Sequence, residues 1–413
     1  MIALAVEELA GLGAVEADAD EVTGVQVDSR RIVPGDLFVA VGGGSAFLAD
    51  ARARGAAATL VADEPHAALA RIGGLVRDRS DARFVAITGS MGKTTTKDIL
   101  AALCRPHART VAAESSYNNE LGVPLTLCRL ELDTEVCVLE LAMRGFGQIA
   151  ALCAFSRPDI AVITSIGPVH LEQVGTLQGV RRAKSELLEA LPAGGTAIVP
   201  ADFPVERDDL EVVRVGADVR LEAFEPEGER ARVVTSLGTL EVNFTMRHLA
   251  ENVVYALAAY RALGLPLDRA GEGASAVVFA DWRNQQLPLP GGGLLINDAW
   301  NANPVSMRAA LEHLRERAAG RRTVAVLGEM AELGDYAEEG HREVGSALRE
   351  LGIDVVVAVG PQARAYGGRS VAGAGEAVAL LRELLEPGDC VLVKGARALA
   401  LEGIAAALAN VPA

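Results

Sequence analysis

The chain has 413 residues, of which 50% are hydrophobic and only 4% are aromatic, and its formal net charge is -16. This length and composition predict two or three domains with their own cores, built from packed α/β layers rather than as an aromatic-rich β-sandwich. The acidic balance opposes nucleic-acid binding, which normally uses a basic surface, and no apolar run approaches the length of a membrane span.

The cysteines and the N-terminus indicate the compartment. Five cysteines, an odd number without a Cys-x-x-Cys pair, are typical of reduced and mostly buried thiols. The first residues lack the basic segment of a signal peptide and become acidic by Glu7. We therefore expect a cytoplasmic protein.

The first 82 residues are predicted to form an N-terminal domain. Its charged end, Arg77–Arg83, has the composition of a linker. The expected elements are three strands and a helix, at Val22–Val27, Leu37–Val41, Thr59–Val61 and Phe47–Arg54.

Residues 83–290 are predicted to form a central domain, in which apolar runs alternate with helical patterns. Runs of this kind, without polar alternation, indicate a parallel sheet that is covered on both faces. The runs are Phe84–Ile87, Val136–Leu139, Ile160–Thr164 and Ala197–Val199.

Residues 291–413 are predicted to form a third domain, which is again α/β. The proline and glycine run Pro288–Gly293 has the composition of a domain boundary. The fold class expected is α/β in three domains, the central one resembling a P-loop ATPase and the last one Rossmann-like. The predicted strands of the last domain are Leu294–Ile296, Thr323–Leu327, Val355–Val359 and Cys390–Val393.

The most informative motif lies directly after the run that ends at Ile87. A glycine turn is followed by Lys-Thr and by a predicted helix, Thr96–Leu103. Glycines let the backbone approach phosphate oxygens, amide groups at a helix start point toward them, lysine neutralises their charge, and a threonine hydroxyl suits magnesium. The loop is shorter than the usual phosphate loop, and a turn that binds nothing is the alternative. Its candidate nucleotide-binding residues are Gly89, Ser90, Met91, Gly92, Lys93, Thr94 and Thr95.

Two further candidates follow neighbouring predicted strands. Glu140 ends the run Val136–Leu139, and His170 comes six residues after Thr164. Ligands of open parallel sheets bind outside the carboxyl ends of the strands, so Glu140 is expected beside the phosphate loop, where a carboxylate can hold magnesium. A solvated acid and a structural histidine are the alternatives.

Other polar groups remain ambiguous from the residues alone. Lys184, in a predicted helix Leu177–Leu191, has the pattern of a surface lysine, and Asn118-Asn119 before Gly and Pro is typical of a turn. His248 and Asn252 are four residues apart at the start of an Ala-rich helix, and this spacing predicts that they share one face.

A dense polar stretch follows the first predicted strand of the third domain. Asn297–Pro304 carries Asp298, Asn301 and Asn303 close together. Such density at a strand end suggests ligand contact as well as helix capping.

Taken together, in this order and spacing, the motifs resemble those of the Mur ligases, the ATP-dependent amide-forming enzymes of bacterial peptidoglycan synthesis. The resemblance covers nearly the whole chain. The matching segments are Thr88–Thr95, Asn118–Leu127, Glu140 with Met143–Gly145, Gly167–Glu172, Ala183–Leu187, Asn301–Pro304 with Ser306-Met307, Leu327–Gly334 and Lys394–Arg397.

The resemblance implies a reaction and its cofactors. D-alanyl-D-alanine would be joined to a UDP-N-acetylmuramoyl-tripeptide through an acyl phosphate, at the expense of ATP and with Mg²⁺. Lys184 matches the lysine that the family carbamylates with CO2. The carbamate, an anionic oxygen donor, would join His170 in holding a second magnesium, whereas Glu140 and Thr94 match the ligands of the first.

The resemblance also implies nucleotide and substrate contacts. His248 and Asn252 match residues beside the adenine, Asp298 matches the acid near the ribose, and Arg283 matches a cation near the phosphates. The expected partners are the two substrates, with no nucleic acid, and a monomer is the expected state. The implied substrate-binding residues are Ser29, Asn118, Asn119, Glu120, Asn301 and Asn303.

The chain departs from the family pattern at four places. The Gly42–Ala46 stretch is shorter than usual, which puts uridine contacts there in question, and the usual serine of Lys-Gly-Ser-Arg is Ala396. Trp300 replaces a tyrosine, and Leu249 replaces an asparagine. A folate polyglutamate ligase and a non-catalytic ATP-binding protein are the alternatives. The third residue of the tripeptide, meso-diaminopimelate or lysine, is left open.

Overall fold

The computed structural model describes residues 1–409. The chain divides into two compact units, which we refer to as the N-terminal unit and the C-terminal unit. The N-terminal unit comprises Met1–Ser165, Arg182–Thr245 and Leu249–Val278; the C-terminal unit comprises Ile166–Arg181, Met246–His248 and the chain from Phe279 onward.

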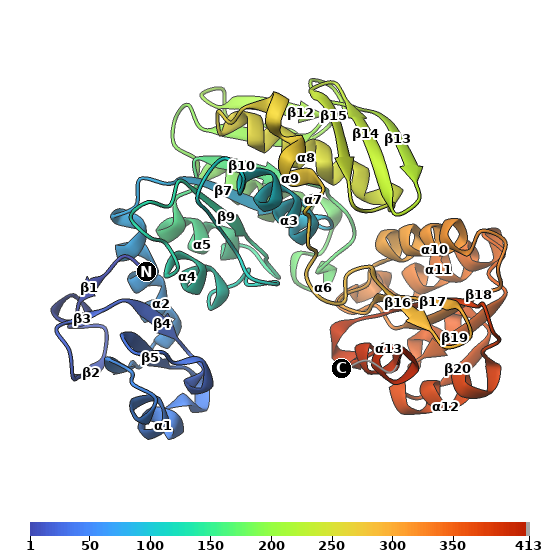
Figure 1. Cartoon of the computed structure of the whole chain (residues 1–413), viewed down its shortest axis with the longest axis horizontal. Helices are drawn as coiled ribbons and strands as arrows, with labels where there is room; N and C mark the ends of the chain where they lie inside the picture. The colour runs from blue at the N-terminus through green and yellow to red at the C-terminus, as the bar shows by residue number, and fades with distance from the viewer. Residues whose placement is uncertain (410–413) are drawn as a thin grey trace. The chain divides into compact units, whose positions relative to one another are not determined.

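The first sheet of the N-terminal unit has four strands in the order β2-β6-β5-β4 (Figure 1). Strands β2 and β6 are antiparallel to each other, and the other neighbouring pairs are parallel. The three strands and the helix predicted for this part are confirmed, although Val22–Val27 is divided between two strands. The elements are β1 (Leu4–Ala5), β2 (Ala14–Ala17), β3 (Glu21–Val22), β4 (Gly24–Gln26), β5 (Asp36–Ala40), β6 (Ala58–Val61), α1 (Leu48–Ala53) and α2 (Pro65–Asp78).

The irregular segment within the predicted linker Arg77–Arg83 is shorter than predicted. Helix α2 continues to Asp78 and the next strand begins at Arg83, so that only residues 79–82 are irregular. The guanidinium carbon of Arg77 lies 3.7 Å from the ring centroid of Phe84, and its Nε donates a 3.0 Å hydrogen bond to the carbonyl of Ser156. The mixed charges of this segment are typical of a solvated linker. The local sequence does not reveal the contact of Arg77 with Ser156, because the two residues are distant in sequence. The boundary at 82/83 stays a prediction.

The second sheet of this unit has six parallel strands in the order β12-β11-β10-β7-β9-β8. The four predicted apolar strands are confirmed, and they are buried on both faces. The strands are β7 (Arg83–Thr88), β8 (Thr110–Ala112), β9 (Val136–Glu140), β10 (Ile160–Ile163), β11 (Thr196–Pro200) and β12 (Glu211–Val215). The helices of this part of the chain are α3 (Lys93–Cys104), α4 (Gly122–Leu127), α5 (Gln148–Ser156), α6 (Leu171–Val174) and α7 (Leu177–Glu189).

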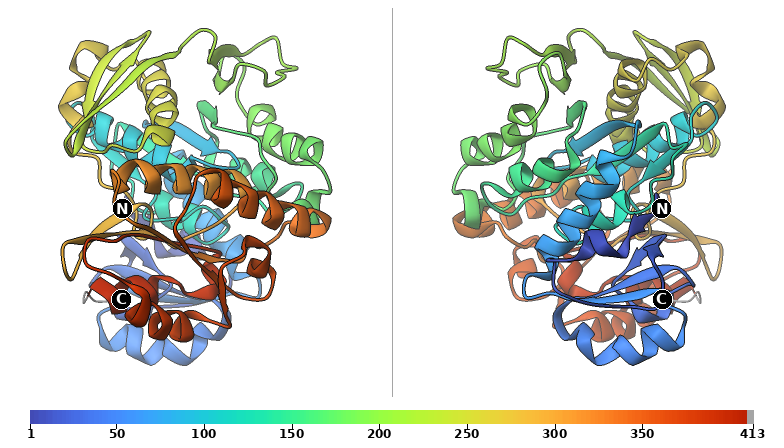
Figure 2. Two further views of the ribbon diagram at one scale, coloured as in Figure 1. Left: turned by 90° about the vertical axis from the view of Figure 1, so that its right-hand side faces the viewer. Right: turned by 90° about the vertical axis from the view of Figure 1, so that its left-hand side faces the viewer.

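Besides the two-stranded antiparallel pair β1-β3, the N-terminal unit has a three-stranded antiparallel sheet, which the sequence analysis did not predict. Its strands, yellow-green in Figure 2, lie beside the gold helices α8 and α9, and their inward side chains include Phe224 and Val233. The elements are β13 (Leu221–Glu227), β14 (Arg230–Thr235), β15 (Gly238–Val242), α8 (Ala250–Ala262) and α9 (Gly271–Ala274).

The C-terminal unit is built on a six-stranded sheet in the order β16-β17-β21-β18-β19-β20, parallel except for the pair β16-β17. Helices α10 and α11 cover one face, and α12 and α13 cover the other (Figure 1). The elements are β16 (Gln285–Leu289), β17 (Gly293–Asp298), β18 (Thr323–Gly328), β19 (Val355–Val359), β20 (Arg369–Val371), β21 (Cys390–Lys394), α10 (Pro304–Ala318), α11 (Ala337–Glu350), α12 (Ala374–Leu384) and α13 (Glu402–Ala409).

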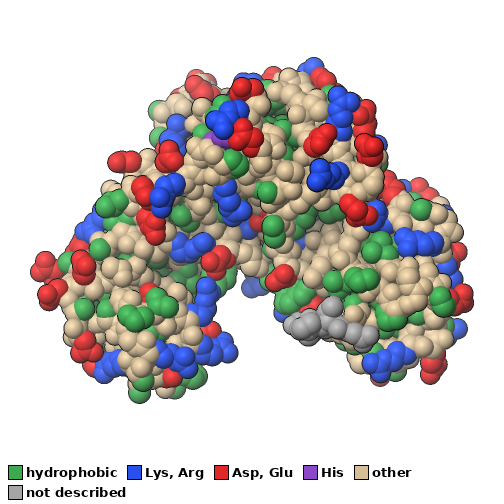
Figure 3. Space-filling view, viewed as in Figure 1, with side chains coloured by type: hydrophobic (Ala, Val, Ile, Leu, Met, Phe, Trp, Pro, Cys, Tyr) green, Lys and Arg blue, Asp and Glu red, His purple; other side chains and the backbone are tan. Residues whose placement is uncertain are grey.

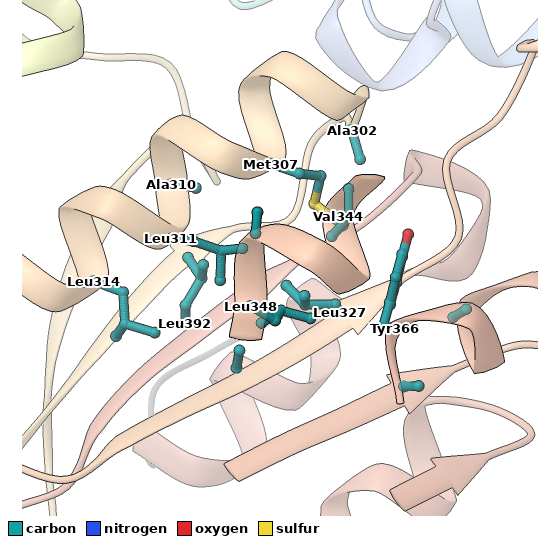
Figure 4. Close-up of a cluster of buried hydrophobic side chains, with 14 of the residues drawn as sticks. Ala302, Met307, Ala310, Leu311, Leu314, Leu327, Val344, Leu348, Tyr366 and Leu392 are labelled. Carbon is teal, nitrogen blue, oxygen red and sulfur yellow. The ribbon is translucent and has the colours of Figure 1, made fainter. Parts of the chain in front are cut away.

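The core between this sheet and helices α10 and α11 is closely packed (Figure 4). Met307 and Leu311 of α10 meet Leu348 of α11 over Leu327 of β18, and all four are at most 2% exposed. The hydroxyl of Tyr366 donates a 3.0 Å hydrogen bond to the carbonyl of Gly328, so the polar end of this buried ring is satisfied. The α/β fold class with parallel sheets is confirmed.

The run Pro288–Gly293 is a hairpin turn and not a segment between domains. It joins the antiparallel strands β16 and β17, which pair from Gln285 with Asn297 to Leu289 with Gly293. The structure therefore places the predicted boundary at 290/291 inside the C-terminal sheet. Proline and glycine mark both hairpins and linkers, and the local sequence cannot separate the two.

The surface and the thiols agree with the composition. Acidic and basic side chains are mixed over the face shown in Figure 3. All five cysteines are buried and free, and burial raises the pKa of Cys104, Cys128, Cys137 and Cys153 to about 12. Within residues 1–409, helices long and apolar enough to span a membrane are absent.

Candidate functional site

The predicted phosphate loop joins the end of β7 to the start of α3. The helix begins at Lys93, three residues earlier than the predicted start at Thr96. The first amide groups of a helix lack intrahelical partners and can bind an anion, and this helix begins directly after Gly92. This corrects the helix boundary and strengthens the interpretation of the motif as an anion-binding turn.

Two glycines of this loop occupy positions that strongly favour glycine. Gly89 and Gly92 have φ values of +153° and +78°. A Cβ on Gly89 would lie 2.0 Å from Oγ1 of Thr164, and one on Gly92 would lie 2.1 Å from Nδ2 of Asn252. The glycines therefore allow the loop to pack closely against two segments that are distant in sequence.

The residues after β10 hold the loop in place. The amide of Ser90 donates to the carbonyl of Ser165 and the amide of Met91 donates to its Oγ, both at 2.9 Å. The hydroxyl of Thr164 donates to the carbonyl of Met91. Sequence analysis did not identify Thr164 and Ser165, and their only signal is their place at the carboxyl end of the strand beside β7.

Lys93 lies over the loop that it follows. Its ammonium group donates a 2.7 Å hydrogen bond to the carbonyl of Gly89, and the residue is half-buried. Thr94, which comes next, is buried. The loop thus combines helix amides, a cation and a hydroxyl at one strand end.

Glu140 ends β9 as predicted, next to β7, where it is in register with Ile87. The carboxylate is buried, and Asn118 donates a 2.8 Å hydrogen bond from Nδ2 to its Oε1. Its other oxygen, Oε2, has no hydrogen-bond partner in the described part of the chain. A buried carboxylate oxygen without a partner is costly, and a hard divalent cation is the partner that such an oxygen prefers.

The remaining residues of the Asn-Asn turn have separate roles. Oδ1 of Asn119 accepts hydrogen bonds from the amides of Leu121 and Gly122 at 3.3 and 3.0 Å, which is turn chemistry. Glu120 is exposed. Of the three predicted substrate residues here, the structure brings only Asn118 into contact with a predicted metal ligand.

Lys184 is fully buried in α7, contrary to the surface position that its helix pattern alone predicts. Burial, and secondarily the positive charge of Lys93, hold the pKa of this amine well below its usual value of 10.5. Lys184 is therefore biased toward the neutral amine, which is the nucleophilic form.

His170 belongs to the segment that packs with the C-terminal unit, where its Nδ1 pairs with the carboxylate of Glu332. Both residues adopt left-handed backbone conformations, with φ values of 54° and 60°. Non-glycine residues in this region are uncommon and cluster at functional sites. Glu332 was missed as a functional candidate, because an acid in a loop has no local signal of its partner.

The polar stretch after β17 is organised by Lys394. Its ammonium group donates to Oδ2 of Asp298 at 2.5 Å and to the carbonyl of Asn301 at 2.9 Å. Asn303 caps α10, where its Oδ1 accepts the amide of Ser306 at 2.9 Å. Asn303 is thus a helix cap, whereas Asn301 is exposed.

The structure does not place His248 and Asn252 on one helix face. His248 lies in a 3₁₀ turn before α8, with its ring in edge contact with His313 of the C-terminal unit. Asn252 lies in α8, and its Nδ2 donates to the carbonyl of Gly92 at 3.2 Å and to Oγ1 of Thr96 at 2.9 Å. The four-residue spacing misled because the helix begins at Ala250, after the histidine.

Ser29 and Arg283 also have defined surroundings. The hydroxyl of Ser29 donates a 2.6 Å hydrogen bond to Oδ2 of Asp50 in helix α1. The guanidinium carbon of Arg283 lies 5.5 Å from the ring centroid of Trp300.

Asn252→Ala is expected to destabilise the protein by about 1–3 kcal/mol, because it removes two buried hydrogen bonds and leaves a gap behind the loop. Urea unfolding followed by circular dichroism measures the change. Glu251→Ala, an exposed position on the same helix, is the control and should change stability by less than about 0.5 kcal/mol. Equal effects of both substitutions would contradict the assigned role of Asn252.

Comparison with known proteins shows two family-model matches. Residues 87–260 match the Mur ligase middle domain, and residues 282–397 match the domain described as Mur ligase, glutamate ligase domain. The chain is 32% identical to the UDP-N-acetylmuramoyl-tripeptide--D-alanyl-D-alanine ligase of Escherichia coli, with 99% of each chain covered. It is 33% identical to the enzyme of the same name from Mycobacterium tuberculosis, with 99% of this chain and 98% of that protein covered.

Solved structures agree with the sequence relatives. A crystal structure of MurF from Acinetobacter baumannii superposes with a TM-score of 0.85 at 29% identity, covering 99% of each chain. MurF ligase from Thermotoga maritima, in complex with ADP, superposes with a TM-score of 0.81 at 25% identity, covering 94% of this chain and 97% of that one. A folylpolyglutamate synthase from Mycobacterium tuberculosis shares the fold, with a TM-score of 0.68 at 18% identity.

Proposed function

The chain belongs to the Mur ligase family, and we propose that it joins D-alanyl-D-alanine to a UDP-N-acetylmuramoyl-tripeptide with hydrolysis of ATP. The observation that carries this proposal is the match over 99% of both chains to a ligase named for these two substrates. The protein is thus an ATP-dependent amide-bond-forming enzyme of peptidoglycan precursor synthesis. The phosphate loop beside a partly unpaired buried carboxylate supports the use of a nucleotide with a divalent cation.

The reaction requires an activated carboxyl group, because a carboxylate at pH 7 does not accept an amine. The terminal carboxylate of the tripeptide attacks the γ-phosphorus of ATP, and ADP leaves, which gives an acyl phosphate. The neutral amine of D-alanyl-D-alanine then attacks the acyl carbon, the amide forms, phosphate leaves and the amine loses a proton. Positioning and charge neutralisation carry most of such a phosphoryl transfer.

The phosphate loop is the part of the chain suited to hold the transferred group. Its helix amides and the ammonium group of Lys93 would neutralise the phosphate oxygens. Thr94 and Glu140 would hold a first Mg²⁺, and the unpaired Oε2 of Glu140 fits that assignment. When bound, the cation supplies charge neutralisation at the phosphates.

Lys184 is proposed to be carbamylated by CO2 and, with His170, to hold a second Mg²⁺. Its burial and its lowered pKa support this assignment, since only the neutral amine reacts with CO2. The contact between His170 and Glu332 also supports it, because histidines that bind metals usually have the other ring nitrogen held by a carboxylate or a carbonyl.

The contacts with nucleoside and substrates remain proposals. His248, Asp298 and Arg283 are assigned to the nucleotide, whereas the buried contacts of Asn252 fit support of the phosphate loop better than direct contact with adenine. Among the substrate candidates, Asn119, Glu120 and Asn301 are exposed, and the half-buried Asn118 contacts Glu140. We further propose a cytoplasmic monomer and three domains.

The uridine diphosphate end is assigned to the first sheet. There, Ser29 is tied to Asp50 and the shortened stretch forms a 3₁₀ helix, Gly42–Phe47. The third residue of the tripeptide, meso-diaminopimelate or lysine, is decided by assay.

Ligation is expected to require the dipeptide. Phosphate release from ATP should appear with a UDP-N-acetylmuramoyl-tripeptide and D-alanyl-D-alanine together, and D-glutamate or meso-diaminopimelate should not replace the dipeptide. The mass of the product is measured under one condition for each amine with each of the two tripeptides. This measurement identifies both the amine and the tripeptide that the enzyme uses. Preference for a single amino acid would move the protein to another branch of the family, and ligation of glutamate to a folate would favour the folate enzyme.

A further inference from the structure

Two tryptophans and an arginine form a cluster in the C-terminal unit beside the exposed Asn301. The rings of Trp282 and Trp300 are stacked, with centroids 5.9 Å apart and planes 23° from parallel. The guanidinium carbon of Arg397 lies 4.6 Å from the ring centroid of Trp282 and 5.6 Å from that of Trp300. These are the only two tryptophans of the chain.

One nitrogen of the Arg397 guanidinium makes a hydrogen bond. Its Nη1 donates a 2.7 Å hydrogen bond to Oε1 of Glu402, and its side chain is 45% exposed. Across residues 1–409 this is the single hydrogen bond that the group makes. A guanidinium has five N–H donors, and the contact with Glu402 uses one of them. The two rings orient the group, and its remaining donors can bind an anion.

The neighbouring cations are already assigned. Lys394 is buried and donates to Asp298 and to the carbonyl of Asn301. Arg283, whose guanidinium carbon lies 5.5 Å from the ring centroid of Trp300, is the cation proposed for the ATP phosphates. Arg397 is therefore the cation beside the Asn301–Pro304 motif with donors left for another ligand.

We propose that Arg397 binds the carboxylate of the incoming dipeptide, an inference that rests on the proposed function. D-alanyl-D-alanine has one amine, which must react, and one carboxylate, which must not. Guanidinium and carboxylate match in a planar, bidentate pair. Two extended residues span about 7 Å. If Arg397 binds the carboxylate at one end of the dipeptide, the amine at the other end lies about this distance from Arg397. A single amino acid spans only about half of that distance, so its amine would not reach the same position.

The test compares D-alanyl-D-alanine with D-alanyl-D-alaninamide, which lacks the charged carboxylate, on the unsubstituted enzyme and on Arg397→Gln. The unsubstituted enzyme should have a KM for the amide about tenfold or more above that for the dipeptide. In Arg397→Gln the KM for the dipeptide should rise to that of the amide, while the KM for the amide and the kcat values change little. Arg382→Gln, an exposed arginine of α12, is the control.

Tryptophan fluorescence supplies a readout without turnover. All of this emission comes from the two rings that contact Arg397, so the dipeptide should shift it in the presence of the UDP-tripeptide and a non-hydrolysable ATP analogue. The amide should not.

Three outcomes would overturn the proposal: equal KM values for the two peptides on the unsubstituted enzyme, equal weakening of both by Arg397→Gln, or a rise in the KM for ATP instead. The absence of product with any peptide would count against the proposed function itself. The comparison of the two peptides needs no variant, so misfolding of Arg397→Gln would not prevent a decision.

Discussion

Lys93→Ala is expected to lower the rate of ligation by about 10²–10³-fold, which corresponds to about 3–4 kcal/mol of lost electrostatic stabilisation in the transition state. The side chain follows the phosphate loop directly and contacts the carbonyl of Gly89 at 2.7 Å. It is half-buried and lies at the helix start rather than in the core, so the fold should persist. Phosphate release at saturating ATP measures the effect.

The control for this substitution lies at the other end of the same helix. Arg105→Ala removes an exposed cation directly after α3 and should leave the rate unchanged. Circular dichroism and thermal unfolding of both variants check the fold. Ligation by Lys93→Ala within tenfold of the unsubstituted enzyme would remove Lys93 from the mechanism.

Removal of CO2 at mildly acidic pH is expected to abolish most of the activity, and bicarbonate should restore it. Burial and the charge of Lys93 lower the pKa of Lys184, so the neutral amine persists to lower pH than in an ordinary lysine. Carbamate formation consumes that amine and releases a proton, and it is therefore favoured as the pH and the CO2 concentration rise. The rate of product formation in degassed and bicarbonate-supplemented buffers, across a pH series, measures this dependence.

Lys184→Arg should not restore function, because guanidinium keeps its charge and does not form a carbamate under these conditions. With ¹³C-labelled bicarbonate, a carbamate resonance should be present in the unsubstituted protein and absent in Lys184→Arg. Lys97→Arg is the matched control, since Lys97 is also buried but its Nζ donates hydrogen bonds to the carbonyls of Ala113 and Ser115. An active Lys184→Arg enzyme, or activity that is indifferent to CO2, would refute the carbamate.

The structure confirms the predictions that depend on local sequence. Apolar runs without alternation mark β7, β9 and β10, because strands buried on both faces need apolar side chains at every position. The glycine turn before Lys93 was found for a similar reason, since its backbone conformation and close contacts favour glycine. The place of Glu140 at a strand end follows directly from the run before it.

Local patterns failed where one composition serves two structures. The charged tract at Arg77 resembled a linker but completes a helix, and Pro288–Gly293 resembled a boundary but turns a hairpin. In each case the deciding contact is with a distant segment, as in the contact of Arg77 with Ser156.

By itself, the sequence determined the glycine turn, the strand-end carboxylate and the buried strands β7, β9, β10 and β11, because short-range spacing and side-chain type dictate them. Only the tertiary structure decided that Lys184 is buried, that Asn252 supports Gly92 and that Arg397 lies over Trp282. The contacts of Asn252 and Arg397 join residues more than 90 positions apart. Lys184 is buried on the same helix as the buried Val180 and Leu187. The free energy that selects these arrangements comes from packing, which a local window of sequence does not contain.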